Sequence, residues 1–153
     1  MSAANAWAEH QILLVEDDRA ILQFSTLVLV HAGYQVKAVG GTLAAWEALQ
    51  SGSYDLLITD NQMPGLSGLE LLSKLRSAQW ALPVVVASGG IVAEELAQDQ
   101  RLQPALALPK PFTSGQLLET VAAALHQTVG DPARTRVSFP AYGDSYSHWG
   151  LNE

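Results

Sequence analysis

Carboxylate, hydroxyl and ammonium groups follow directly after four short apolar runs of this sequence, at residues 12–15, 56–59, 84–87 and 106–109. The polar residues at these four positions are Glu16, Asp17, Asp18, Asp60, Ser88 and Lys110. If the runs are parallel strands of one sheet, their ends meet on the edge where α/β folds bind ligands. Carboxylates beside a hydroxyl and an ammonium group suit a divalent cation together with a phosphoryl group.

Asp60 follows the run nearest the middle of the chain, and its carboxylate can act as a nucleophile toward phosphorus. Such an attack brings two anions together, and a hard cation reduces their repulsion. Mg²⁺ prefers oxygen ligands and usually takes one or two carboxylates. Asp17 and Asp60 can supply them, Glu16 can hold a coordinated water, and the backbone carbonyl of Gln62 can complete the protein's share.

The acidic triplet at residues 16–18 has a second interpretation as a helix N-terminus, with Asp18 as the capping residue. Capping alone does not explain a further carboxylate, Asp60, at a second strand end, because crowded carboxylates repel one another. A metal site accounts for that repulsion. We therefore expect Asp18 to cap the helix and its two neighbours to contribute to the site.

Ser88 and Lys110 also have two interpretations each. Ser88 precedes two glycines, so it either begins a turn or donates its hydroxyl to a phosphoryl oxygen. Lys110 lies between two prolines that fix where its side chain emerges. It is either a solvated lysine or a charge that neutralises a phosphoryl oxygen and pairs with Asp60 when phosphate is absent. The Lys110–Pro111 bond is a candidate for the cis form.

Strand-like and helix-like segments alternate between the residues that carry this chemistry. The apolar spacing predicts helices over residues 20–31 with Gly33 as the C-cap, 42–50 with Thr42 as a cap, 67–77, 92–100 and 114–126 with Thr113 as a cap. Residues 34–39 alternate like a fifth, partly exposed strand. Five strands interleaved with five helices predict an α/β fold with a parallel sheet covered on both faces. We expect a flexible N-terminus at residues 1–10, one domain at 11–127 and a disordered or loosely docked tail at 128–153.

Length and composition exclude several classes of protein. The 153 residues suffice for one domain, and a net charge of −7 argues against a nucleic-acid partner. Cysteine is absent, which excludes disulfides and thiolate metal sites. The first residues lack a signal-peptide pattern, and no apolar run is long enough to span a membrane. We expect a cytoplasmic protein without a membrane partner.

The stretches ILLVEDD, LLITDNQMPGLSG, PVVVASGG and LPKPF make residues 11–127 resemble the CheY-like receiver domains of response regulators in two-component signalling. The resemblance implies a doubly wound (βα)5 fold with the flavodoxin-like strand order 2-1-3-4-5. It also implies that Asp60 accepts a phosphoryl group from a histidine kinase or a histidine phosphotransfer protein. The site residues would be Asp17, Asp60 and the Gln62 carbonyl as Mg²⁺ ligands, Glu16 through water, and Ser88 and Lys110 on the phosphoryl group.

One residue departs from the family pattern. Receiver domains commonly carry an aromatic residue three positions before the lysine, and this position is Ala107 here. The usual coupling of that ring to the hydroxyl residue is therefore not expected, and a switch would have to use residues 88–91 and the helix after them. The residues after His126 are too few for a DNA-binding domain. We expect a stand-alone receiver, not an enzyme, that signals to an output protein through protein–protein contacts.

Three alternatives belong to other classes. An interaction domain that is independent of phosphorylation agrees with Ala107, but the acid, hydroxyl and lysine set opposes it. A phosphatase with an aspartyl nucleophile needs a second acid two residues after Asp60, where Gln62 cannot act as one. A flavin carrier needs a phosphate-binding loop rich in Ser, Thr and Gly after the first strand, and the sequence has none there.

Overall fold

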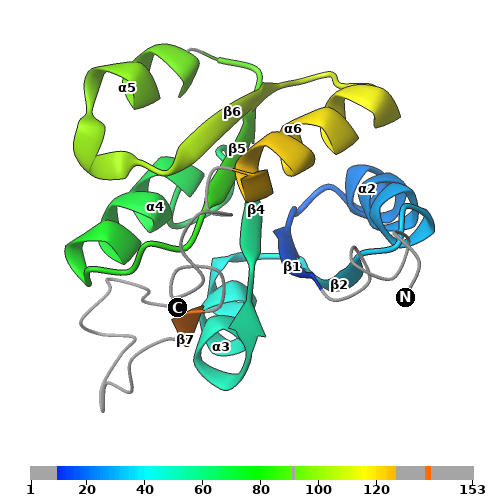
Figure 1. Ribbon diagram of the computed structural model, residues 1–153, viewed down its shortest axis with the longest axis horizontal. Helices are drawn as coiled ribbons and strands as arrows, with labels where there is room; N and C mark the ends of the chain where they lie inside the picture. The colour runs from blue at the N-terminus through cyan, green and yellow to red at the C-terminus, as the bar shows by residue number, and fades with distance from the viewer. Residues whose placement is uncertain (1–9, 91, 127–136, 139–153) are drawn as a thin grey trace.

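A single five-stranded parallel sheet forms the centre of the molecule (Figure 1). The computed structural model describes residues 10–90, 92–126 and 137–138. The strands of the sheet are β1 Gln11–Val15, β2 Gln35–Val39, β4 Leu56–Asp60, β5 Val84–Ser88 and β6 Ala105–Pro109. They lie in the order β2-β1-β4-β5-β6 and all neighbouring pairs are parallel. Numbered along the chain, these five strands have the expected order 2-1-3-4-5.

Helices cover both faces of the sheet. They are α2 Arg19–His31, α3 Thr42–Ser51, α4 Gly68–Ser77, α5 Val92–Gln98 and α6 Ser114–His126. Ile12 and Leu14 of β1 face α2 and α6, whereas Leu13 and Val15 face the core formed with α3, α4 and α5. Burial on both faces explains why the strand is a continuous apolar run. The expected doubly wound α/β fold is therefore confirmed.

Side-chain caps begin three of the helices. Asp18 accepts hydrogen bonds from the backbone N–H groups of Ala20 and Ile21 at 2.9 and 3.2 Å, as expected for the cap of α2. Ser67 and Glu70 form a capping box at α4. Thr113 accepts from the N–H of Gln116 at 3.1 Å at the start of α6, which confirms the predicted cap.

Two of the predicted caps are displaced by one position. Thr42 was expected to cap α3, but the N-cap is Gly41, and Thr42 is the first residue of the helix and is buried. At the end of α2 the C-cap is Ala32, and Gly33 follows it. Gly33 has a φ of 106°, a left-handed conformation that favours glycine.

Short elements that the sequence pattern did not predict connect the larger ones. The α5 helix ends at Gln98 and not at residue 100, because Asp99 caps a separate 3₁₀ turn, η1 Gln100–Leu102, by accepting from the N–H of Arg101. Strands β3 Ser53–Tyr54 and β7 Val137–Ser138 form an antiparallel pair outside the main sheet. The Lys110–Pro111 bond is cis, as predicted.

The predicted flexible N-terminus and the predicted tail lie outside the described residues, apart from His10 and the two residues of β7. Among the described helices, none is both long and apolar enough to cross a membrane.

Candidate functional site

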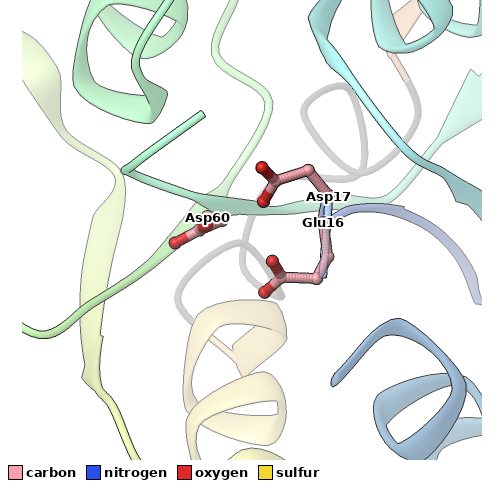
Figure 2. A group of neighbouring side chains, drawn as sticks. All are labelled: Glu16, Asp17 and Asp60. Atoms are coloured by element: carbon pink, nitrogen blue, oxygen red, sulfur yellow. The ribbon is translucent and has the colours of Figure 1, made fainter. Parts of the chain in front are cut away.

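The carboxyl ends of β1, β4, β5 and β6 lie on the same edge of the sheet and bring the predicted polar residues together. Asp60 is the last residue of β4 and pairs in register with Ala87 of β5. Ser88 ends β5 and pairs with Pro109, so that Lys110 follows directly on the neighbouring strand. Glu16 and Asp17 follow β1 and direct their carboxylates toward Asp60 (Figure 2). The edge thus collects residues that are far apart in the sequence.

Three carboxylates form a compact cluster at this edge. Glu16, Asp17 and Asp60 each offer an oxygen that lies within 4.8 Å of the others (Figure 2). Glu16 and Asp60 are buried, with 4% and 5% of their surfaces exposed, whereas Asp17 is exposed to solvent. Oxygen donors from carboxylates are the ligands that Mg²⁺ and Ca²⁺ take. The donor set therefore fits a hard divalent cation that approaches from the side of Asp17.

Lys110 is the cation that the structure places inside the cluster. Its Nζ lies 2.8 Å from Glu16 Oε1 and 3.1 Å from Asp60 Oδ1. The ion pair with Asp60 agrees with the sequence analysis, and the ion pair with Glu16 was not predicted. The cluster contains three carboxylates, and Lys110 pairs with two of them, so two negative charges remain unbalanced when all are ionised. This excess is a second reason why the site fits a divalent cation.

Burial and pairing act in opposite directions on two of these groups. Burial raises the pKa of Glu16 above its ordinary value, and it outweighs the hydrogen bonds from Lys110 and from the Asp18 N–H, which lower it. Burial alone would lower the pKa of Lys110, but the hydrogen bonds and charges of Glu16 and Asp60 raise it overall. The lysine is therefore held protonated beside Asp60.

Ser88 begins a turn and also fixes the backbone before Lys110. Its buried Oγ accepts a hydrogen bond from the N–H of Gly90 at 3.0 Å. Its carbonyl accepts from the N–H of Lys110 at 2.9 Å. The first of the two interpretations of Ser88, the start of a turn, is thus confirmed. The second, a hydrogen bond from its hydroxyl to a phosphoryl oxygen, stays a prediction.

Asn61 and Gly68, two residues that position Asp60, were not predicted from the sequence. A Cβ added to Gly68 would lie 2.6 Å from the backbone oxygen of Asp60, so only glycine lets α4 approach β4 this closely. Asn61 Oδ1 accepts from the N–H of Leu69 at 3.0 Å, and the Asn61 carbonyl accepts from the N–H of Gly68 at 3.1 Å. The start of α4 is thereby bound to the end of β4. In the sequence, the Ser67-Gly68 pair at a helix start was the signal from which this contact could have been predicted.

Gln62 and Ala107 lie near the site without a described contact to it. Gln62 is exposed in the loop between β4 and α4, and the role of its carbonyl stays a prediction. Ala107 pairs in register with Val86 and packs at the edge of the core under α3, α4 and α5. The position that holds an aromatic ring in many receivers therefore carries only a methyl group here.

A doubly wound parallel sheet with an acidic cluster, a serine and a lysine at its carboxyl edge defines the receiver class of signalling domains. The model of the response regulator receiver domain family matches residues 12–122. The chain belongs to this family.

Several relatives and solved structures are similar to the chain. The response regulator protein FleR of Pseudomonas aeruginosa is 35% identical over 121 residues, which cover 78% of this chain and 26% of that protein. A response regulator receiver protein from Sinorhizobium medicae superposes with a TM-score of 0.67 at 30% identity, over 76% of this chain and 94% of that one. The Thermotoga maritima response regulator TrrA, solved in complex with Mg²⁺-BeF, superposes with a TM-score of 0.64 at 26% identity, over 75% of this chain and 98% of that one.

The chain is shorter than the curated relatives that it matches. It covers 26%, 24%, 26% and 54% of the lengths of four of them. The chain therefore corresponds only to the receiver domain of these relatives. The activities of the complete proteins are not assigned to it.

Proposed function

We propose that Asp60 accepts a phosphoryl group from a histidine kinase or a histidine phosphotransfer protein, in a reaction that depends on Mg²⁺. The receiver domain would span residues 11–127 and signal by contact with an output protein. The observation that carries the proposal is the buried Asp60 carboxylate, which lies 3.1 Å from Lys110 Nζ and within 4.8 Å of the Glu16 and Asp17 oxygens. A cytoplasmic location stays a prediction.

The transfer forms one bond and breaks one. A carboxylate oxygen of Asp60 attacks the phosphorus atom of a phosphohistidine, and the O–P bond forms as the P–N bond breaks. The electron pair of the broken bond stays on the imidazole nitrogen. Lys110, now 3.1 Å from Asp60, exchanges this partner for a phosphoryl oxygen and neutralises its charge. The Ser88 hydroxyl donates a hydrogen bond to a second phosphoryl oxygen. The protein's part is to position and stabilise charge, so the domain is a signalling protein rather than a classical enzyme.

The excess negative charge at this edge of the sheet supports the binding of a magnesium ion. Asp17, Asp60 and the Gln62 carbonyl would hold it directly, and Glu16 would do so through a water molecule. When bound, it supplies the positive charge that lets the anionic carboxylate approach the anionic phosphoryl group. The two unbalanced negative charges of the cluster and the Mg²⁺-BeF complex of the similar receiver TrrA favour this assignment.

Ala107 favours a second candidate, an interaction domain whose partner binding is independent of phosphorylation. A methyl group at this position cannot turn inward as a ring does, so the signal would have to travel through residues 88–90 and α5. The intact acid, hydroxyl and lysine set makes the phosphoacceptor the better supported of the two.

The test is intact-mass spectrometry of the full chain after incubation with acetyl phosphate. We expect the wild type to gain one phosphoryl group with Mg²⁺ and none with EDTA. Asp60→Asn should gain none. The matched control is Asp99→Asn, which removes an acid at the end of α5, away from the cluster, and should be labelled like the wild type. Equal labelling of Asp60→Asn, or labelling without a metal ion, would contradict the proposal. A folded wild type that is never labelled would favour the second candidate.

A further inference from the structure

One face of α2 is unusually apolar for the surface of the molecule. Phe24, Leu27 and Val30 are 42%, 70% and 53% exposed. No charged residue lies on α2 between Arg19 and His31. A surface helix normally presents polar residues to water, and an exposed apolar patch usually marks a binding surface. This face of the helix is therefore a candidate binding surface.

A groove runs along this patch between α2 and α6, which lie side by side in Figure 1. Its volume is about 580 Å³. The lining residues are Leu27, Val28, Val30, His31, Ala32, Ser114 and Leu118. Most of them are apolar, and His31 lies at the end of α2. The groove fits a segment with apolar or aromatic side chains and little charge.

The C-terminal part of the sequence contains such a segment. Phe139, Tyr142, Tyr146 and Trp149 follow one another at intervals of three, four and three residues. These aromatic side chains can serve as the apolar anchors of a peptide that binds in a groove between helices. Residues 139–151 contain no lysine or arginine and one acid, Asp144.

Strand β7 brings this segment to the correct end of the molecule. Ser138 pairs with Ser53 of β3, and Asp55, which follows β3, donates its N–H to the carbonyl of Gln11 at 2.8 Å. Gln11 begins β1 and pairs with Gln35, the first residue of β2, the strand that follows α2. The chain thus leaves β7 beside α3, at the same end of the sheet as the end of α2 (Figure 1).

The length of the segment is sufficient to cover the groove. Residues 139–153 can extend to about 50 Å, at about 3.3 Å per residue. The 13 residues of α2 span about 20 Å, at about 1.5 Å per residue. A tethered segment also reaches an effective concentration of about 1 mM, which favours it over a second molecule.

We propose that residues 139–151 bind in the groove between α2 and α6, where their aromatic side chains cover Leu27, Val30 and Leu118. The chain then shields its own apolar surface, and any partner of this face must displace the segment. The proposal is independent of whether Asp60 accepts a phosphoryl group.

Paramagnetic broadening in NMR spectra tests this contact, because a chain without cysteine can be labelled at one introduced position. A nitroxide on Ser147→Cys should remove more than half of the amide signal intensity of Leu27, Val30 and Leu118, compared with the reduced label. The added substitution Leu27→Asn should restore the signals of Val30 and Leu118. Since Leu27 is 70% exposed, this change should not disturb the fold.

Two controls make the result decisive. The same label on Ser77→Cys, an exposed residue of α4 on the opposite face of the sheet, should leave the groove signals unchanged. Unchanged groove signals with the label at residue 147 would overturn the proposal. A mixture of labelled chains without ¹⁵N and unlabelled chains with ¹⁵N should show no broadening. Broadening in that mixture would assign the groove to a second copy and would also overturn the proposal.

Discussion

Glu16 connects two parts of the strand edge. Its Oε1 accepts a hydrogen bond from Lys110 Nζ at 2.8 Å, and its Oε2 accepts from the N–H of Asp18 at 3.1 Å. The residue therefore holds the lysine in place and also fixes the backbone at the start of α2. Its burial beside Asp60 makes its negative charge unfavourable, and this has a measurable consequence.

Replacing Glu16 by glutamine should change how stability depends on pH. The pKa of Glu16 in the folded protein is raised from 4.5, so the protonated form favours folding. Its contribution to stability is fully present below 4.5 and is lost as the pH rises through the raised pKa. In EDTA, Glu16→Gln should therefore gain stability relative to the wild type as the pH rises from 4.5 through the raised pKa, as measured by urea unfolding. Glu119→Gln on α6 controls for the loss of one charge. A constant difference between Glu16→Gln and wild type would contradict the prediction.

Asp17 should control the response to magnesium, because it is the exposed acid of the cluster. Without metal, Asp17→Asn should stabilise the protein by about 1 kcal/mol, the repulsion of two charges about 4 Å apart in water. Millimolar Mg²⁺ should raise the melting temperature of the wild type by mass action and have little effect on Asp17→Asn. Thermal unfolding with Mg²⁺ or EDTA measures both. The control Asp18→Asn keeps a capping side chain at α2 and should retain the magnesium shift. An equal shift in Asp17→Asn and wild type would exclude Asp17 as a ligand.

The elements that build the site differ in how well they can be predicted from the sequence. Strands β1, β4 and β5 were predictable because they are buried on both faces and read as apolar runs. The caps at Asp18 and Thr113 were predictable because their side chains act locally. The two-residue strands β3 and β7 have no periodicity, and only their pairing in the fold defines them. The end of α5 was placed too late because the capping of η1 by Asp99 competes with further α-helix.

Gly68 shows how one helix start positions the site, and its replacement by alanine should be harmful. The added Cβ would lie 2.6 Å from the Asp60 carbonyl oxygen and 3.0 Å from Asn61 Cα, and both neighbours are backbone atoms. Gly68→Ala should therefore lower the free energy of unfolding by about 1–3 kcal/mol, since α4 must move away from β4. Urea unfolding measures this loss.

Gly115 of α6 provides the matched control. A Cβ at this position would approach only Thr113 Oγ1, at 3.9 Å. Gly115→Ala should leave stability unchanged or raise it by about 0.4–1 kcal/mol, because alanine loses less conformational entropy. Equal effects of the two substitutions on the free energy of unfolding would show that the close contact at Gly68 does not affect stability.

At the scale of the whole molecule, the site exists because the fold brings four strand ends to one edge. Sequence order and parallel topology were enough to predict that Asp60, Ser88 and Lys110 would lie on neighbouring strands. The ion pair between Glu16 and Lys110, 94 residues apart, was not predictable, because it depends on where two side chains extend after their strands. The contact of Gly68 with Asp60 also depends on how α4 packs against the sheet.

The central claim is that Asp60 is the phosphoacceptor, and borohydride mapping tests it most directly. Borohydride reduces an acyl phosphate to an alcohol, which marks the acceptor permanently for peptide mass spectrometry. After incubation of the wild type with acetyl phosphate and Mg²⁺, we predict that Asp60 is the single reduced residue and that EDTA abolishes the reduction. Reduction at Glu16 or Asp17, or reduction of Asp60 without a metal ion, would contradict the claim.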